Sequence, residues 1–130
     1  MKILFIAGLT LFACALPHQS SATDQDRPVL DVIVVEINND LDGFLERMQR
    51  IQAVAERLKL AAKLRVFQST FAAGKTGEIH LYWELPSFLA FAQAETALHN
   101  DSEFLAILEE LDAAGQSFSS ELLSIEITKQ

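Results

Sequence analysis

The alternation of hydrophobic and polar residues along the chain predicts a β-hairpin near its centre. Residues 77–85 alternate between polar side chains and the apolar Ile79, Leu81, Trp83 and Leu85. This two-residue repeat is typical of a strand with one apolar and one polar face. Residues 64–71 are rich in β-branched and aromatic side chains, and a loop with two glycines joins the two stretches. We expect an antiparallel pair, because glycine readily supplies the positive φ angles of such loops.

The first and last strands are predicted at residues 29–37 and 121–128. The earlier stretch, VLDVIVVEI, is strongly apolar and β-branched, as is typical of a central strand. In the later stretch, ELLSIEIT, the apolar Leu123, Ile125 and Ile127 form one row, and the residues of the opposite row are mostly polar. Both patterns repeat every two residues and therefore indicate strands.

Helical spacing of apolar residues appears between these strands. Residues 41–59 follow the cap candidates Asn38-Asn39-Asp40 and place an apolar stripe at Leu41, Phe44, Leu45, Met48, Ile51, Ala55 and Leu58. A second helix is predicted from residue 88, with Ser87 as its cap, and Asn100-Asp101-Ser102 interrupts it. Its second segment covers residues 103–114 and ends at Gly115. Each cap residue can accept a hydrogen bond from the backbone of the first helical turn.

The order of the predicted elements is strand, helix, strand, strand, helix in two pieces, and strand. Two right-handed crossovers around an antiparallel four-stranded sheet give a ferredoxin-like plait (βαββαβ), an α+β fold with both helices on one sheet face. The apolar rows expected beneath the helices are Ile33, Val35 and Ile37; Ile79, Leu81 and Trp83; and Leu123, Ile125 and Ile127.

The opposite face of this sheet combines apolar and polar side chains. Its predicted members are Val32, Val34, Leu122, Glu36, His80, Tyr82, Glu84, Ser124 and Glu126. We expect a second copy of the chain to cover this face, because it is too apolar for water and too polar for a core. His80, Tyr82 and Glu84 are the catalytic candidates, since such groups in a cavity can acquire pKa values suited to acid–base chemistry. The alternative is a satisfied hydrogen-bond network inside the barrel, or a dimer contact, without a reaction.

The candidate residues for a ligand pocket come from both faces of the sheet, and the sequence pattern leaves open which face holds the pocket. The candidates are Glu36, Asn38, His80, Tyr82, Trp83 and Glu84. Trp83 belongs to an apolar row and is also interpreted as a core residue. The chain has no HExxH, HxH or cysteine pair, so neither a metal nor a cofactor is predicted.

Residues 1–22 have the composition of an export signal. Lys2 precedes an apolar run, and Ser20-Ser21-Ala22 forms a small-residue exit, which predicts cleavage after Ala22 with Ala15 as an alternative. A lipoprotein anchored at Cys14 is a further alternative, because Leu11-Phe12-Ala13-Cys14 looks like a lipobox. The mature chain is expected to be periplasmic or secreted, without a membrane span. It would consist of a polar lead-in at residues 23–28 and one domain at residues 29–128.

The charge of the mature chain excludes one class of partner. Lys2 is the only charged residue among the first 22, so the remaining 108 residues carry 9 basic and 18 acidic side chains, a net charge of −9. This charge repels phosphate backbones, so nucleic acid is not an expected partner. Cleavage would also remove Cys14, the only cysteine, and with it any disulfide or thiol chemistry.

The sequence resembles the dimeric α+β barrel superfamily, especially its antibiotic-biosynthesis-monooxygenase-like and NIPSNAP-like branches. The resemblance rests on the order of elements, on FAAGKTGEIHLYWELPS at residues 71–87 and on the helix FLAFAQAETALHNDSEF that follows. It covers nearly all of residues 29–128 and implies a homodimer whose two sheets close into a barrel. Of the residues used by haem-degrading members, Trp83 matches the tryptophan of the third strand. Asn38 and Asn39, at the end of the first strand, and His99, at the far end of its helix, match their positions poorly.

Three functions remain open, because this superfamily contains oxygenases, isomerases and proteins without a known reaction. The first is an exported homodimer that binds a small, partly apolar ligand, either between sheet and helices or within the barrel. The second is a cofactor-independent monooxygenase of the antibiotic-biosynthesis type, with His80, Tyr82 and Trp83 shaping the site. The third is a structural or protein-interaction module without catalysis.

Overall fold

The computed structural model describes residues 27–70 and 77–126 of the 130-residue chain. The predicted signal segment with Cys14, most of the hairpin loop, and Ile127 and Thr128 lie outside the described residues. The elements are, in order, β1 (Val29–Glu36), α1 (Leu41–Arg57), β2 (Lys63–Gln68), β3 (Ile79–Leu85), α2 (Phe88–His99), α3 (Ser102–Ala113) and β4 (Ser117–Ile125).

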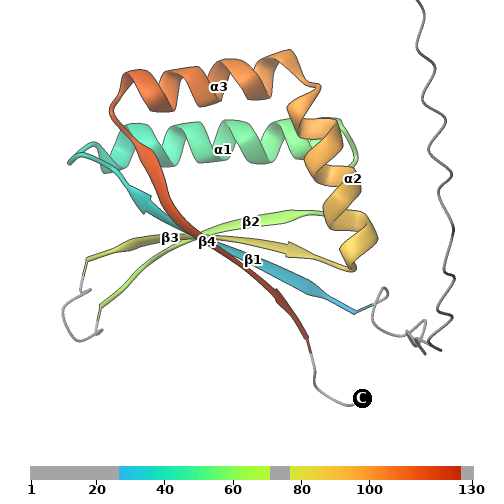
Figure 1. Cartoon of the computed structure of the whole chain (residues 1–130). Coiled ribbons are helices and arrows are strands. Elements are labelled where there is room, and N and C mark those ends of the chain that lie inside the picture. Colours follow the sequence, from blue (N-terminus) through green and yellow to red (C-terminus); the bar gives the residue numbers. More distant parts are fainter. Residues whose placement is uncertain (1–26, 71–76, 127–130) are drawn as a thin grey trace, which may run out of the picture.

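The four strands form one antiparallel sheet in the order β2-β3-β1-β4. β1 is a central strand, as the sequence predicts, and pairs with β3 on one side and with β4 on the other. Figure 1 shows α1 and α3 side by side over one face of the sheet, with α2 at one end of the same layer. The ferredoxin-like βαββαβ arrangement predicted from the sequence is therefore confirmed.

The helices begin where the predicted capping residues stand. Asp40 accepts a hydrogen bond from the Gly43 amide at 3.0 Å and begins α1. Ser87 accepts one from the Ala90 amide at 3.1 Å and begins α2. Asp101 caps α3, and its carboxylate also accepts two hydrogen bonds from Arg57, at the end of α1. Capping side chains satisfy backbone donors that the first helical turn leaves free, and the Arg57 contact additionally ties α1 to α3.

Several ends of elements differ from the sequence prediction. α1 ends at Arg57 instead of residue 59, because Lys59 has a positive φ of 57° and cannot continue the helix. Gly77 has a φ of +93° and precedes β3, which agrees with the predicted glycine turn. At the loop, β2 ends at Gln68 instead of residue 71, and β3 begins at Ile79 instead of Gly77.

The largest difference concerns β4, which begins at Ser117 instead of residue 121. The segment SFSS lacks an apolar alternation, but it pairs with the end of β1 after an irregularity in register at Val34 and Val35. The row Leu123 and Ile125 was expected beneath the helices, yet these side chains are 37% and 43% exposed. The reason is visible in Figure 1, where the last part of β4 runs away from α1 and α3.

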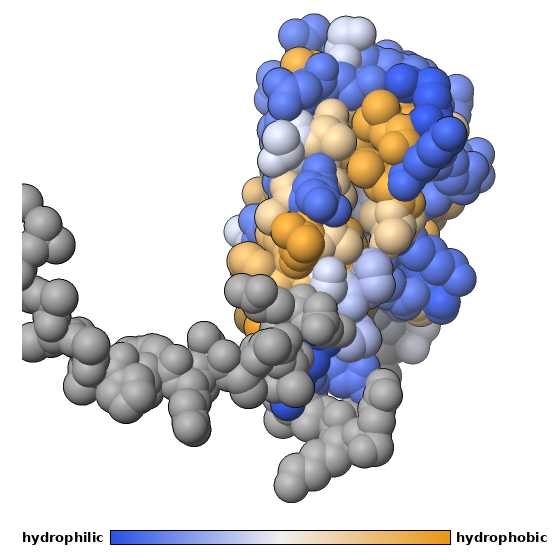
Figure 2. All heavy atoms as spheres, turned by 90° about the vertical axis from the view of Figure 1, so that its right-hand side faces the viewer, coloured by the Kyte–Doolittle hydropathy of each residue, from blue (hydrophilic) through white to orange (hydrophobic). Residues whose placement is uncertain are grey.

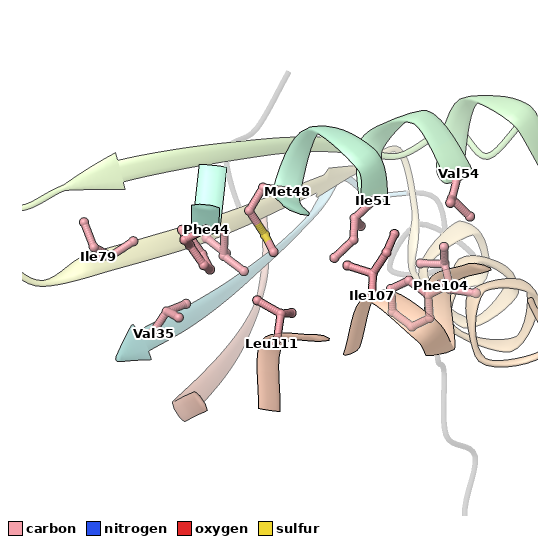
Figure 3. Close-up of a cluster of buried hydrophobic side chains, with 11 residues drawn as sticks. Val35, Phe44, Met48, Ile51, Val54, Ile79, Phe104, Ile107 and Leu111 are labelled. Carbon is pink, nitrogen blue, oxygen red and sulfur yellow. The ribbon is translucent and has the colours of Figure 1, made fainter. Parts of the chain in front are cut away.

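The core lies between the sheet and the helix pair α1 and α3. Phe44, Val54 and Ile107 are its largest fully buried side chains. Val35 and Ile79, from two of the predicted apolar rows, approach Phe44 from the sheet, while Ile107 faces α1 from α3 (Figure 3). The packing of these side chains positions α2 and α3 over the sheet, and so determines the space that remains between them.

Replacing the core residue Phe44 is expected to destabilise the whole domain. Phe44→Ala removes a completely buried ring and should lower the free energy of unfolding by about 3–5 kcal/mol, because transfer and cavity terms add. Urea unfolding followed by circular dichroism measures this change. Leu89→Ala, at an exposed position of α2, is the control and should change the stability by less than about 1 kcal/mol. Equal losses in both variants would contradict the assigned core.

Candidate functional site

A cavity of about 230 Å³ lies between the sheet and the helices. Its walls come from every helix and every strand of the sheet, and most of the side chains that line it are apolar, including Ile33, Met48, Leu81, Trp83, Leu98 and Phe104. Figure 2 views the side on which α2 lies in Figure 1, where apolar surface is bordered by polar residues. A concave, largely apolar space with a few polar groups is the usual form of a small-molecule site.

Asp31 is the polar group inside this cavity. It lies on β1 in the same row as Ile33 and Val35, so the alternation of the strand turns it toward the helices. Its side chain is only 2% exposed, and its Oδ1 atom has no hydrogen-bond partner within residues 27–70 and 77–126. Buried carboxyl oxygens are normally paired, because an unpaired one loses its hydration without compensation. Asp31 therefore has an open acceptor position in the cavity.

Two further carboxyl groups stand near Asp31. Glu121 lies on the neighbouring β4, diagonally across the sheet from Asp31, since it pairs with Ile33. Glu95 projects from α2 and also lines the cavity. Burial raises the pKa of Asp31 to about 6, and the negative charges of Glu121 and Glu95 add to the effect. Both glutamates are exposed, so they form the rim of the cavity while Asp31 lies inside it.

The rim also holds His99, which lies one helical turn after Glu95 on α2. Its Nδ1 atom is 2.9 Å from the Glu95 carbonyl oxygen and 3.6 Å from the carboxylate of the same residue. The ring makes an edge contact with Phe104, with 5.6 Å between ring centroids. His99 is the one titratable base among the described residues that line the cavity. The arrangement thus offers an apolar volume with a carboxyl that can accept a hydrogen bond or a proton.

The structure separates the site residues that the sequence predicts. Trp83 lines the cavity and pairs across the sheet with Asp31. His80, Tyr82 and Glu84 lie on the opposite sheet face, where they border a separate shallow hollow. A site of this one chain that joins Trp83 with His80 and Tyr82 is therefore not formed, because neighbouring residues of a strand point to opposite faces.

Each of the three catalytic candidates has its own partner. The His80 Nε2 atom is 3.0 Å from the Ser69 hydroxyl and 3.1 Å from the Glu78 carboxylate. Tyr82 makes an edge contact with Phe67, with 4.9 Å between ring centroids. Glu84 is paired with Arg65 at 3.1 Å. The contacts of His80 and Glu84 pair polar groups, as the alternative interpretation of this face expects, whereas the contact of Tyr82 is with an aromatic ring.

Glu36 and Asn38 lie apart from the other candidates. Glu36 ends β1, is exposed, and pairs with Ser117 of β4. Asn38 has a positive φ of 49° in the turn before α1. Its side chain lies so close to Gly115 that a Cβ atom there would be 2.8 Å from Nδ2. We therefore interpret Asn38 as a turn residue that packs against the end of α3.

Sequence reasoning overlooked Asp31, Glu95 and Glu121. A signal for Asp31 was present, because it is the one charged residue in the row of β1 that also contains Ile33 and Val35. Glu95 has the ordinary appearance of an exposed helical residue, and Glu121 was placed at the very start of the last strand. Their approach to Asp31 depends on the register of β4 and the position of α2.

Two absences hold for the described part of the chain. Residues 27–70 and 77–126 contain no group of three or more metal-ligating side chains. In the same residues, no helix is long and apolar enough to cross a membrane.

The pKa of Asp31 predicts an unusual dependence of stability on pH. Between about pH 4 and pH 6 the folded chain keeps this proton while the unfolded chain loses it, so stability falls as pH rises. By about pH 8 the loss should reach about 3 kcal/mol. Asp31→Asn removes this loss, so its advantage over the native chain in urea unfolding should grow from pH 4 to pH 8. Asp112→Asn, at an exposed position of α3, is the control, and an equal trend there would refute the assignment.

Comparison with solved structures places the fold among known ones. No protein-family model and no curated protein matches the chain. A NIPSNAP family protein from Agrobacterium tumefaciens aligns with a TM-score of 0.57 and 14% identity, over 79% of this chain and 87% of that one. A second NIPSNAP family protein from the same organism, described as of unknown function, gives 0.54 and 16% over 78% and 87%. A NIPSNAP-like domain protein from Burkholderia xenovorans gives 0.55 and 13% over 81% and 87%. The chain therefore has the ferredoxin-like α+β fold of these NIPSNAP structures.

Proposed function

We propose that this protein binds a small, largely apolar molecule in the cavity between the sheet and the helices. The observation that carries the proposal is the cavity itself, about 230 Å³ in volume and lined mainly by apolar side chains. An engineered apolar cavity of about 150 Å³ in another protein is large enough to take up benzene. A ligand of one aromatic ring with a short substituent therefore matches the space available here.

The position of the cavity supports binding rather than imperfect packing. It lies between α2, α3 and the sheet, beside a core whose central residues Phe44, Val54 and Ile107 are completely buried. Voids within such cores are normally smaller than a water molecule or few in number. A space of this size with Trp83 and a buried carboxyl at its wall has the features of a ligand site.

Filling the cavity should abolish binding. Ala94 is a buried residue of α2 that lines the cavity, and Ala92 is an exposed residue on the same helix. Ala94→Leu should weaken the binding of 2-phenylethanol at least tenfold, because the added side chain occupies the ligand volume, whereas Ala92→Leu should bind it as the native chain does. The fluorescence of Trp83, the only tryptophan, reports binding directly. Thermal unfolding confirms that both variants fold, and binding of equal strength in both would overturn the proposal.

We also propose that the mature protein is exported and forms a homodimer through the open face of its sheet. The open face is the side away from the helices and consists of Leu30, Val32, Val34, Phe67, His80, Tyr82, Glu84 and Leu122. Its apolar members include Phe67 and Leu122, which are exposed in the single chain. Exposed apolar side chains that gather on one face of a protein commonly mark a surface that a partner covers. Export rests on the signal predicted at residues 1–22.

A charge on the open face should dissociate the dimer. Leu122 is 63% exposed on β4 and Leu89 is 62% exposed on α2, so the two positions are matched in residue type and exposure. Leu122→Glu should give a monomer in size-exclusion chromatography with light scattering, because a carboxylate in an apolar interface loses its hydration. Leu89→Glu should remain a dimer. A monomeric native chain, or a dimer lost only in Leu89→Glu, would refute this interface.

A further inference from the structure

Three carboxyl groups surround a cavity to which the described residues contribute no lysine or arginine. Asp31 lies inside it with an unpaired oxygen, and Glu95 and Glu121 stand at its rim. The acidic rim by itself would be an ordinary solvated surface. The decisive observation is Asp31, whose side chain is almost completely buried at the wall of an apolar space and lacks a partner for Oδ1. A buried acceptor of this kind calls for a donor that the protein does not provide.

We propose that the cavity selects ligands that combine an apolar body with a positively charged nitrogen, such as small aromatic or aliphatic amines, and that Asp31 receives the ammonium group. This inference rests on the proposed binding function and specifies its ligand class. The apolar walls take the hydrocarbon part of the ligand. The ammonium group donates to Asp31, while Glu95 and Glu121 add long-range attraction at the entrance.

Trp83 contributes a second recognition element for a cation. It pairs with Asp31 across the β1–β3 ladder and lines the same cavity, so its side chain and the carboxyl lie next to each other on one sheet face. The face of an indole ring attracts an ammonium group, and the attraction grows when water is excluded. A carboxylate ligand would instead meet the charge of Asp31 inside the cavity and the charges of Glu95 and Glu121 at its rim, and the site should reject it.

The charge state of the site depends on the groups that face Asp31. These are Glu121 from β4 and Glu95 with His99 from α2, whereas the cavity residues of α1, α3, β2 and β3 are uncharged. Protonation of Asp31 removes the charge that holds the amine, so amine affinity should fall as pH decreases through about 6. His99 also stands at the rim of the cavity, so a variant must separate its contribution from that of Asp31.

The experiment compares three probes of similar shape by titration of Trp83 fluorescence. The probes are 2-phenylethylamine, the neutral 2-phenylethanol and the anionic 3-phenylpropanoate. At pH 7.5 the native chain should bind the amine at least tenfold more tightly than the alcohol and should not bind the acid measurably. In Asp31→Asn the ratio of amine to alcohol affinity should fall at least tenfold, and its dependence on pH should disappear. In His99→Gln the dependence on pH should persist.

The outcomes distinguish this inference from the proposed function. Equal binding of amine and alcohol, with no change of their ratio in Asp31→Asn, would overturn the selection of amines while cavity binding stands. Binding of 3-phenylpropanoate as tight as that of the amine would overturn it in the same way. Failure of the native chain to bind any of the three probes would count against the cavity as a ligand site, and therefore against both proposals.

Discussion

The pairing of β1 with β3 on one side and β4 on the other is the constraint on which the rest of the structure depends. β1 and β3 alternate in step along their whole ladder, and β4 stays in step with β1 up to the irregularity at Val34 and Val35, so these pairings decide which side chains of the sheet face the helices. That face carries Val35, Ile79 and Leu81 into the core beneath Phe44 and Ile107. The helices that cover it begin at Asp40, Ser87 and Asp101, whose side chains satisfy the first backbone donors.

The same register brings a carboxyl group into an apolar space. A shift of β1 by one residue would move Asp31 to the open face, but it would also expose Val29, Ile33 and Val35. Each fully buried aliphatic side chain contributes about 1.5–3 kcal/mol, so the row as a whole outweighs the cost of about 3 kcal/mol that a pKa near 6 implies for Asp31. The fold therefore retains a destabilising group at this position, as is common where a site binds or reacts.

The strength of the local hydrophobic pattern explains which helices and strands could be predicted from the sequence and which could not. The capped helices and the hairpin strands have strong periodic signals, and their positions agree with the structure within a few residues. The start of β4 was missed because SFSS has no apolar alternation, and only its pairing with Val34, Val35 and Glu36 of β1 makes it a strand. His80, Tyr82 and Glu84 could be placed on one sheet face from their spacing. Their partners Ser69, Phe67 and Arg65 come from or next to β2 and depend on register.

The sequence by itself determined the order of elements, the helix caps and the side of each strand on which a residue lies, because these follow from the periods of 2 and 3.6 residues and from hydrogen bonds within one turn. Only the tertiary structure decided that Asp31, Glu95 and Glu121 meet around one cavity while Glu36 and Asn38 stand apart. These contacts join β1, α2 and β4, which are distant in the chain. Their geometry is set by strand register and by the packing of helices on the sheet, which no local pattern of residues specifies.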